Sequence, residues 1–198
     1  MYRFIRLFLI LALAVVTQAG CLSPPARLYL LEPIVDEQSQ RTPTQVQAIA
    51  LAVVSLPEYA DSQAIPTRIN SARVVLSKHH QWAESPDGAI TRVLANRIQA
   101  FTGGTTLVEP WPRGFEPEAR LEYEFHKLLR DEKGGVEVAG QMRLISGDGD
   151  DVLAIRSFQY FRETQDNESK DFFYAMSLVI NDIARLTAST LREMEIQN

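Results

Sequence analysis

Residues 120–129 read RLEYEFHKLL, and this stretch decides the fold class of the chain. Polar and apolar side chains alternate through its first seven positions. A period of two is typical of a β-strand that buries one face and exposes the other, as strands of antiparallel sheets commonly do. The stretch therefore predicts an antiparallel strand. Its core face carries Leu121, Tyr123 and Phe125, and its solvent face carries Glu122, Glu124 and His126.

Two further strands follow, each after a short turn. The glycines of residues 133–135 supply the first turn, and residues 136–144 then alternate again. The second turn is the acidic segment 147–150, and residues 152–162 form the third strand, with Phe158 on the buried side. Apolar alternation bounded by glycine-rich turns predicts a three-stranded antiparallel meander.

Helical periodicity appears in two stretches. Residues 86–101 follow Ser85, a suitable N-cap, and begin with Pro86, whose missing N–H costs nothing at the first helical position. Gly103 then favours the end of that helix. A longer helix is predicted at residues 170–193, where apolar side chains recur in a broad stripe.

Shorter strands are predicted at residues 28–31, 46–56, 72–77 and 105–108, and residues 57–69 are predicted to be an ordered loop. The second of these strands (VQAIALAVVSL) is apolar throughout, which indicates burial on both faces. The sum is an α+β fold, a two-layer sandwich with a mostly antiparallel sheet and two main helices packed on one face.

Residues 1–20 have the features of a secretory signal peptide. Arg3 and Arg6 give a positively charged start, and residues 7–16 are an unbroken apolar run. That run is too short to span a bilayer, which needs about 20 residues. The small residues Ala19-Gly20 are typical of a cleavage site.

Cys21 follows directly and is the only cysteine in the sequence. Its position resembles a bacterial lipobox, in which the thiol is acylated and the signal is removed. The alternative is a secreted protein with one free thiol, because an odd cysteine in an exported chain needs an explanation. On the lipoprotein interpretation, residues 21–27 are a lipidated start with a short tether, and residues 28–198 form a single α+β periplasmic domain.

The charge of the mature chain argues against some partners. Removal of residues 1–20 takes away Arg3 and Arg6 but no acidic residue, so the formal net charge falls from −5 to −7. An acidic surface does not favour nucleic acid or anionic lipid. Attachment to a membrane would then depend on the acyl chains at Cys21.

A search for catalytic and metal-binding patterns yields nothing specific. His79 and His80 have no carboxylate or cysteine at ligand spacing, and His126 lies on the polar face of a predicted strand. The acidic turn at residues 147–150 lacks the spacing of a calcium loop. We therefore predict that the protein is not an enzyme and needs no cofactor or metal.

Aromatic and basic residues in two loops are candidates for a binding surface. Tyr59, Ile65 and Arg68 lie in the predicted loop 57–69, and Trp111 is bracketed by prolines. Tyr, Trp and Arg are residue types that protein interfaces favour. The alternative is structural: Tyr59 and Ile65 cover an edge of the sheet, Arg68 pairs with a carboxylate, and Trp111 caps the core.

A series of short segments is spread along most of the mature chain. They are RLYLL at 27–31, LPEY at 56–59, IPTR at 65–68, WAE at 82–84, RVLAN at 92–96, PW at 110–111 and SLVINDIA at 177–184. In their order and spacing these segments resemble the ABC-type transport auxiliary lipoprotein family, and within it the PqiC-like branch.

The resemblance implies a non-catalytic role at the outer membrane of a Gram-negative bacterium. Such lipoproteins work with an MCE-domain tunnel protein (PqiB-like) in an inter-membrane lipid transport system that maintains envelope integrity. Leu22 agrees with this location, because an Asp after the lipidated cysteine would retain the protein at the inner membrane. The resemblance also implies a homo-oligomer such as a ring, since a symmetric tunnel is best met by a symmetric cap.

A second function shares the same anchor and fold class. A lipoprotein could instead activate a periplasmic enzyme such as a cell-wall synthase. Activators of that kind usually need a long tether to cross the cell-wall layer, and residues 22–27 are short. The tether therefore favours the transport role.

Overall fold

The computed structural model describes residues 25–34, 41–164 and 169–197. A short 3-10 helix, η1, covers Glu58–Ala60. The helices are α2 (Pro86–Thr102) and α3 (Ser169–Gln197). The strands are β1 (Arg27–Tyr29), β2 (Ala48–Leu51), β3 (Ala64–Asn70), β4 (Arg73–Trp82), β5 (Thr105–Val108), β6 (Ala119–Arg130), β7 (Val136–Ser146) and β8 (Val152–Arg162).

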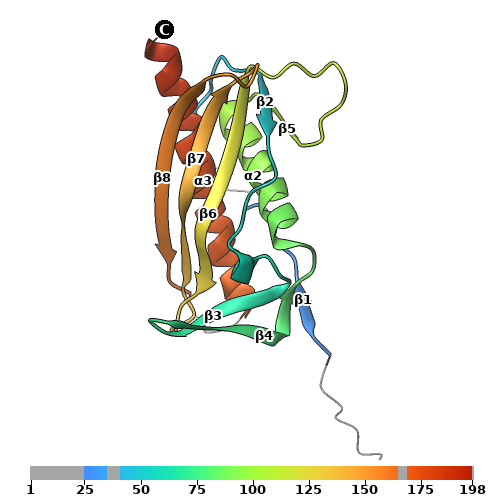
Figure 1. The fold of residues 1–198 in the computed structure, drawn as a ribbon, viewed down its shortest axis with the longest axis vertical. Helices are drawn as coiled ribbons and strands as arrows, with labels where there is room; N and C mark the ends of the chain where they lie inside the picture. Colours follow the sequence, from blue (N-terminus) through green and yellow to red (C-terminus); the bar gives the residue numbers. More distant parts are fainter. Residues whose placement is uncertain (1–24, 35–40, 165–168, 198) are drawn as a thin grey trace, which may run out of the picture.

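The strands of the described residues form one open, mixed sheet around β6 (Figure 1). β6 pairs with β7 along its whole length in antiparallel fashion, and β8 pairs with β7 in the same way. On its other side β6 runs parallel to β2 near its start and to β3 near its end. β5 extends the sheet beyond β2, and β4 and β1 extend it beyond β3. The long pairs are antiparallel, and the short ones other than β3–β4 are parallel.

The predicted meander is confirmed, and so are its two faces. Leu121, Tyr123 and Phe125 of β6 are buried, whereas Glu124 and His126 are exposed. Glu122 lies on the same solvent face and forms an ion pair with Arg143 of β7, with Nε and Oε2 3.0 Å apart. The alternating pattern therefore identified the side of the sheet that the helices cover.

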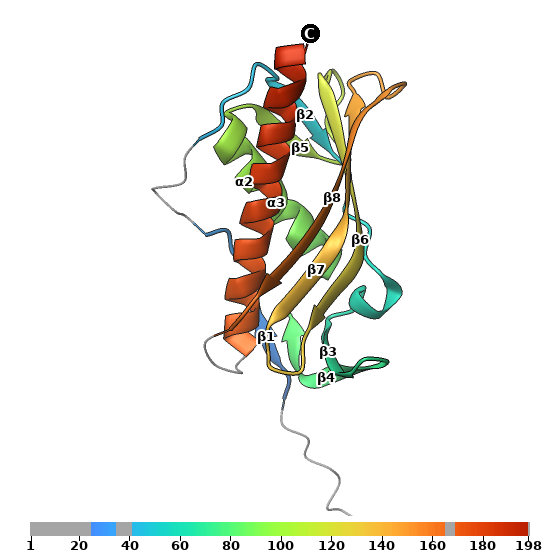
Figure 2. The ribbon, with the colours of Figure 1, turned by 90° about the vertical axis from the view of Figure 1, so that its left-hand side faces the viewer.

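Both helices pack on the same face of the sheet, which confirms the predicted α+β sandwich (Figure 2). α2 begins at Pro86 after Ser85, although the Ser85 side chain makes no capping hydrogen bond. The helix ends at Gly103, which adopts the left-handed conformation that glycine reaches at little cost (φ 82°). Between the helices, Nε of Arg97 donates to Oδ1 of Asn181 at 2.8 Å.

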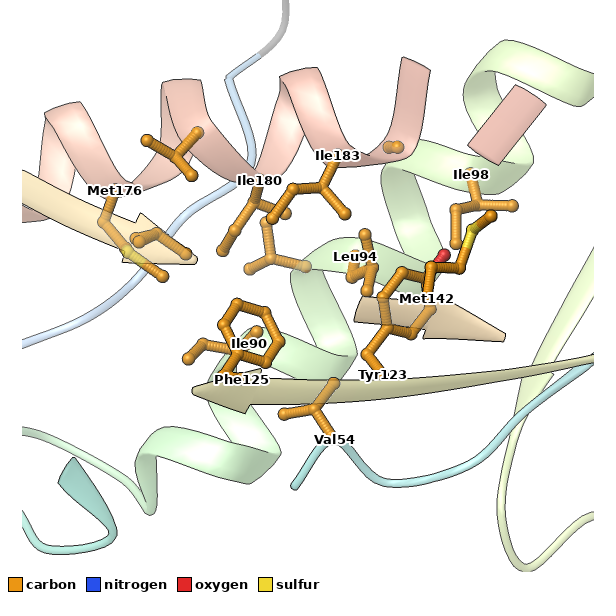
Figure 3. Close-up of a cluster of buried hydrophobic side chains, with 14 of the residues drawn as sticks. Val54, Ile90, Leu94, Ile98, Tyr123, Phe125, Met142, Met176, Ile180 and Ile183 are labelled. Atoms are coloured by element: carbon orange, nitrogen blue, oxygen red, sulfur yellow. The ribbon is translucent and has the colours of Figure 1, made fainter. Parts of the chain in front are cut away.

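The core lies between the sheet and the two helices (Figure 3). Tyr123 and Phe125 of β6 point from the sheet toward the helices, and Ile98 and Ile183 point toward the sheet from α2 and α3. All four side chains are at most 3% exposed. Phe125 also meets Phe158 of β8 in an edge-on contact, with ring centroids 5.4 Å apart.

The strand predicted at residues 46–56 is shorter than expected. β2 ends at Leu51, and only an isolated bridge from Ser55 to Glu124 continues along β6. The hydroxyl of Thr91 in α2 accepts the hydrogen bond of the Val54 N–H at 3.1 Å. The backbone is therefore drawn away from the sheet ladder at this point, which an apolar sequence run cannot reveal.

The prediction of a loop through residues 57–69 was wrong in its second half, since β3 begins at Ala64. Pro66 lies inside this strand, next to a shift in the pairing register with β4. Proline lacks an N–H and is tolerated in strands mainly at edges and bulges, so the sequence favoured a loop.

The strand predicted at residues 72–77 is longer than expected and continues as β4 to Trp82. Its second half is polar and partly exposed, so it lacks the alternating apolar residues that predict a strand. Trp82 is fully buried, with its ring 4.8 Å from that of Phe173 in α3, so it belongs to the core.

Candidate docking surface

His80 and His126 have different surroundings. His80 of β4 faces Tyr29 of β1, with Nδ1 2.9 Å from the tyrosine oxygen. His126 of β6 lies beside Glu124 on the solvent face, 3.5 Å away. Within the described ranges, no three His, Cys, Asp or Glu side chains come close enough together to hold a metal ion.

The surface of the described residues carries several depressions. One of about 350 Å³ is lined by Arg68 of β3, by Asp131 of the β6–β7 turn and by Glu137 of β7. Another of about 420 Å³ lies beside the first turns of α3, at Tyr174 and Leu178. The first depression is lined by both basic and acidic side chains, among them Arg68, Lys133 and Glu132.

The three predicted interface residues of segment 57–69 make structural contacts. The hydroxyl of Tyr59 accepts the backbone N–H of Leu128 at 3.3 Å. Ile65 is only 2% exposed and is part of the core rather than of an open surface. Arg68 pairs with Glu137 of β7, which also lies 3.4 Å from Nζ of Lys127. The structural alternative accounts for these contacts, and a binding role for Tyr59 and Arg68 stays a prediction.

Trp111 lies in the β5–β6 loop, residues 109–118, which is partly exposed and ordered by aromatic and cationic contacts. Its ring is 6.4 Å from the ring of Phe115, and the guanidinium carbon of Arg120 is 5.9 Å from its centroid. Nε of Arg120 in turn donates to the carbonyl oxygen of Gly147 at 2.7 Å. These contacts connect the loop to the β7–β8 turn and fix the position of the Trp111 side chain.

The loop lies at one end of the molecule, and the described chain starts at the other. In Figure 1 the yellow-green β5–β6 loop is close to the C-terminal end of α3, whereas β1 lies at the opposite end. Of the four predicted interface residues, Trp111 alone belongs to this end. Tyr59, Ile65 and Arg68 are close to β3 and to the end of β6.

The contacts of Phe115 and Arg120 were not predicted from the sequence. Phe115 follows Trp111 by four positions in a proline-rich segment, which would have been the available signal. Cys21, the predicted lipid attachment site, lies outside the described residues. Among the described residues, no helix is both long and apolar enough to cross a membrane.

Comparison of the sequence with models of known protein families gives one match. A family model for the ABC-type transport auxiliary lipoprotein component matches residues 29–188, which is most of the chain. No curated protein sequence matches.

Solved structures show the same fold at low sequence identity. An uncharacterized protein matches with a TM-score of 0.70 and 14% identity, over 85% of this chain and 99% of its own. A Xanthomonas campestris protein of the DUF330 family matches with a TM-score of 0.68 and 12% identity, over 86% of this chain and 98% of its own. At such identities the likeness concerns the fold alone.

Proposed function

The chain belongs to the ABC-type transport auxiliary lipoprotein family, and from this membership we propose that it is a non-catalytic subunit of an MCE-type inter-membrane lipid transport system. In this proposal it is anchored at the outer membrane, faces the periplasm and helps to maintain envelope integrity. The observation that carries the proposal is the family match across residues 29–188.

The proposed anchor is Cys21, acylated after removal of residues 1–20. Two or more acyl chains give stable attachment to a bilayer, and each buried methylene contributes about 0.8 kcal/mol. Residues 22–27 then hold the domain close to the membrane. Leu22 supports the outer membrane as the site, because it is not the aspartate that would signal retention at the inner membrane.

The proposed docking surface for the MCE tunnel protein is the β5–β6 loop with Trp111. The start of β1 must lie near the membrane if Cys21 is the anchor, so the opposite end of the molecule faces the periplasm. The β5–β6 loop lies at that opposite end (Figure 1). A tryptophan held by Phe115 and Arg120 offers a large contact area at a small cost in side-chain entropy.

A ring of several copies fits this role. An MCE tunnel built from identical subunits presents a symmetric end, and a symmetric cap repeats each contact around it.

The test is a pull-down of the lipidated protein from membranes, with its partners identified by mass spectrometry. We expect an MCE-domain protein in the eluate, and Trp111→Ala should reduce its recovery. Tyr174→Ala is the matched control, because Tyr174 is an exposed aromatic residue (62%) on α3, away from the loop. Recovery of a cell-wall synthase in place of an MCE protein would favour the activator role.

Equal recovery of the MCE protein with wild type and Trp111→Ala would remove the loop from the docking surface and leave the partnership standing. Absence of any MCE protein from the wild-type eluate would contradict the partnership itself.

A further inference from the structure

We propose that β1 and the β3–β4 hairpin form a second membrane contact, which lies on anionic lipid headgroups beside the acyl anchor. The inference rests on the proposed anchor at Cys21 and assigns a lipid surface to a part of the fold that the proposed docking role leaves unused.

The first observation is the charge of the hairpin. Residues 64–82 contain Arg68, Arg73 and Lys78 and no aspartate or glutamate, in a chain whose acidic residues outnumber its basic ones by 25 to 20. Residues 25–31, which include β1, add Arg27 and again no acidic residue. Basic residues close to an anionic membrane surface are attracted to it and strengthen binding.

Among the described residues, two of the three cations of the hairpin have no acidic partner. Arg68 is paired with Glu137, but neither Arg73 nor Lys78 forms an ion pair within the described part of the chain. Of the neighbouring acidic residues in the β6–β7 turn, Asp131 already accepts the backbone N–H groups of Lys133 and Gly135. Arg73 and Lys78 are therefore available to an external anion.

The second observation is that large apolar side chains are exposed on the same elements. Ile69 is 46% exposed and Leu76 is 48% exposed, and Val74 lies near them at the tip. On the neighbouring strand β1, Leu28 and Leu30 are 61% and 58% exposed. A surface that combines exposed apolar residues with basic ones is characteristic of segments that lie in a membrane interface.

The third observation is position. The hairpin projects from the end of the molecule where β1 lies, in both Figure 1 and Figure 2. Cys21 precedes Arg27 by six residues, which span at most about 22 Å even when fully extended. If Cys21 carries the acyl chains, β1 is held within that distance of the headgroups, and the hairpin is the part of the domain that projects beside it.

The environment of His80 agrees with a positive potential at this end. Its pKa is lowered from the ordinary value of 6.5, first by burial and then by the positive charges of Arg27 and Arg130, with a contribution from His79. The same potential attracts anionic headgroups.

A second copy of this acidic chain is the competing occupant, because its negative surface would also attract the hairpin. The short tether favours lipid, since it holds the hairpin beside the bilayer whatever the number of copies. A measurement of whether a label on the hairpin reaches the lipid headgroups distinguishes the two occupants.

The experiment places a fluorophore on the hairpin of the lipidated full-length protein. Leu76→Cys introduces a thiol that can be labelled with bimane, because the acylated Cys21 does not react. Wild type is labelled in parallel, and an absence of label on it tests the anchor separately. The labelled protein is reconstituted in vesicles of phosphatidylcholine and phosphatidylglycerol that contain a nitroxide-headgroup lipid.

We expect the emission of the Leu76 label to be quenched in these vesicles, and less in vesicles without phosphatidylglycerol. Leu153→Cys is the matched control, because Leu153 has a similar exposure (41%) near the start of β8, at the other end of the meander, and its label should stay bright. Arg73→Gln with Lys78→Gln should remove most of the quenching in anionic vesicles.

A Leu76 label as bright as the Leu153 label on vesicle-bound protein would overturn the proposal. The proposal is also overturned if the Leu76 label is shielded from solvent in detergent-solubilised oligomers and is not quenched by the nitroxide lipid in vesicles. That result would assign the hairpin to a contact with a second copy. If wild type takes up the label, the anchor is refuted, and co-flotation of the unlipidated protein with anionic but not neutral vesicles decides the hairpin contact alone.

Discussion

The hydroxyl oxygen of Tyr123 on β6 lies 2.6 Å from Oγ1 of Thr187 on α3, inside the core. Oγ1 of Thr187 also lies 2.9 Å from the carbonyl oxygen of Ile183 and 3.3 Å from Sδ of Met142, and either hydroxyl can be the donor in the pair with Tyr123. Burial raises the pKa of Tyr123, which keeps the hydroxyl neutral. The Thr187 hydroxyl therefore links the helix layer to two strands of the sheet, β6 through Tyr123 and β7 through Met142, within a largely apolar region.

Removal of the two partners should have unequal effects on stability. Thr187→Val leaves the Tyr123 hydroxyl buried without its partner and should cost about 1–3 kcal/mol. Tyr123→Phe removes the bond but leaves Thr187 satisfied by Ile183, so about 1 kcal/mol is expected. Urea denaturation of both variants measures the difference. A larger loss for Tyr123→Phe than for Thr187→Val would contradict this account.

Truncation of the core face of β6 should be much more costly than truncation of its solvent face. Phe125→Ala leaves a cavity beneath Phe158 and should cost about 3–5 kcal/mol. Glu122→Ala removes an exposed ion pair with Arg143 and should change the free energy of unfolding by no more than about 0.5 kcal/mol. Chemical denaturation under identical conditions compares the two. A costlier Glu122→Ala would mean that the faces of the strand are reversed.

Cys21→Ser tests the anchor in the cell. Serine cannot accept the thioether-linked lipid, so we expect the variant to be lost from the outer-membrane fraction. Density-gradient fractionation followed by immunoblotting measures this. Wild-type retention of the variant in the outer membrane would show that another feature attaches the protein.

The histidines can be removed together to test for catalysis. A combined His79→Ala, His80→Ala and His126→Ala variant should fold, although it loses the contact between His80 and Tyr29. We expect it to complement a deletion strain under membrane stress, because a non-catalytic subunit needs no acid or base. Circular dichroism provides the folding control. A folded variant that fails to complement would argue for chemistry at one of these residues.

Tyr59 and Arg68 test a second binding surface. If they take part in an interface, Tyr59→Ala with Arg68→Ala should weaken self-assembly or retention on an immobilised MCE partner. Their internal contacts predict some loss of stability as well, since Tyr59 binds Leu128 and Arg68 pairs with Glu137. Light scattering gives the oligomer mass, and thermal unfolding gives the stability. Unchanged mass and retention would restrict both residues to a structural role.

The sequence predicted those parts of the fold in which burial follows a regular period. β6, β7 and β8 expose one face and bury the other, so their limits and faces were readable from alternation alone. The helices carry wide apolar stripes and end at glycine or polar residues. The parallel pairings of β2 could not be predicted, because β2 is short and its partners β5 and β6 are far away in the sequence. Such pairings leave no periodic signal.

The candidate binding residues were predicted with less success, for a physical reason. The sequence of a proline-containing segment does not show whether its tyrosine, isoleucine or arginine side chains face water or the core. Ile65 is buried because β3 turns it inward, and that strand was hidden by Pro66. Trp111 could be singled out, but its contact with Arg120 depends on how the loop returns to β6.

The place of β2 between β5 and β6 has a consequence for the order of folding. Ile49 pairs with both Thr106 and Ala119, which are synthesised much later in the chain. Contacts between such distant positions require a long loop to close before they yield any stabilisation, and proteins rich in them fold slowly. The centre of the sheet therefore cannot form until residue 119 is available. If the chain is exported as proposed, this delay is useful, because a polypeptide that stays unfolded until its C-terminal half has emerged can still be threaded through a narrow translocation channel.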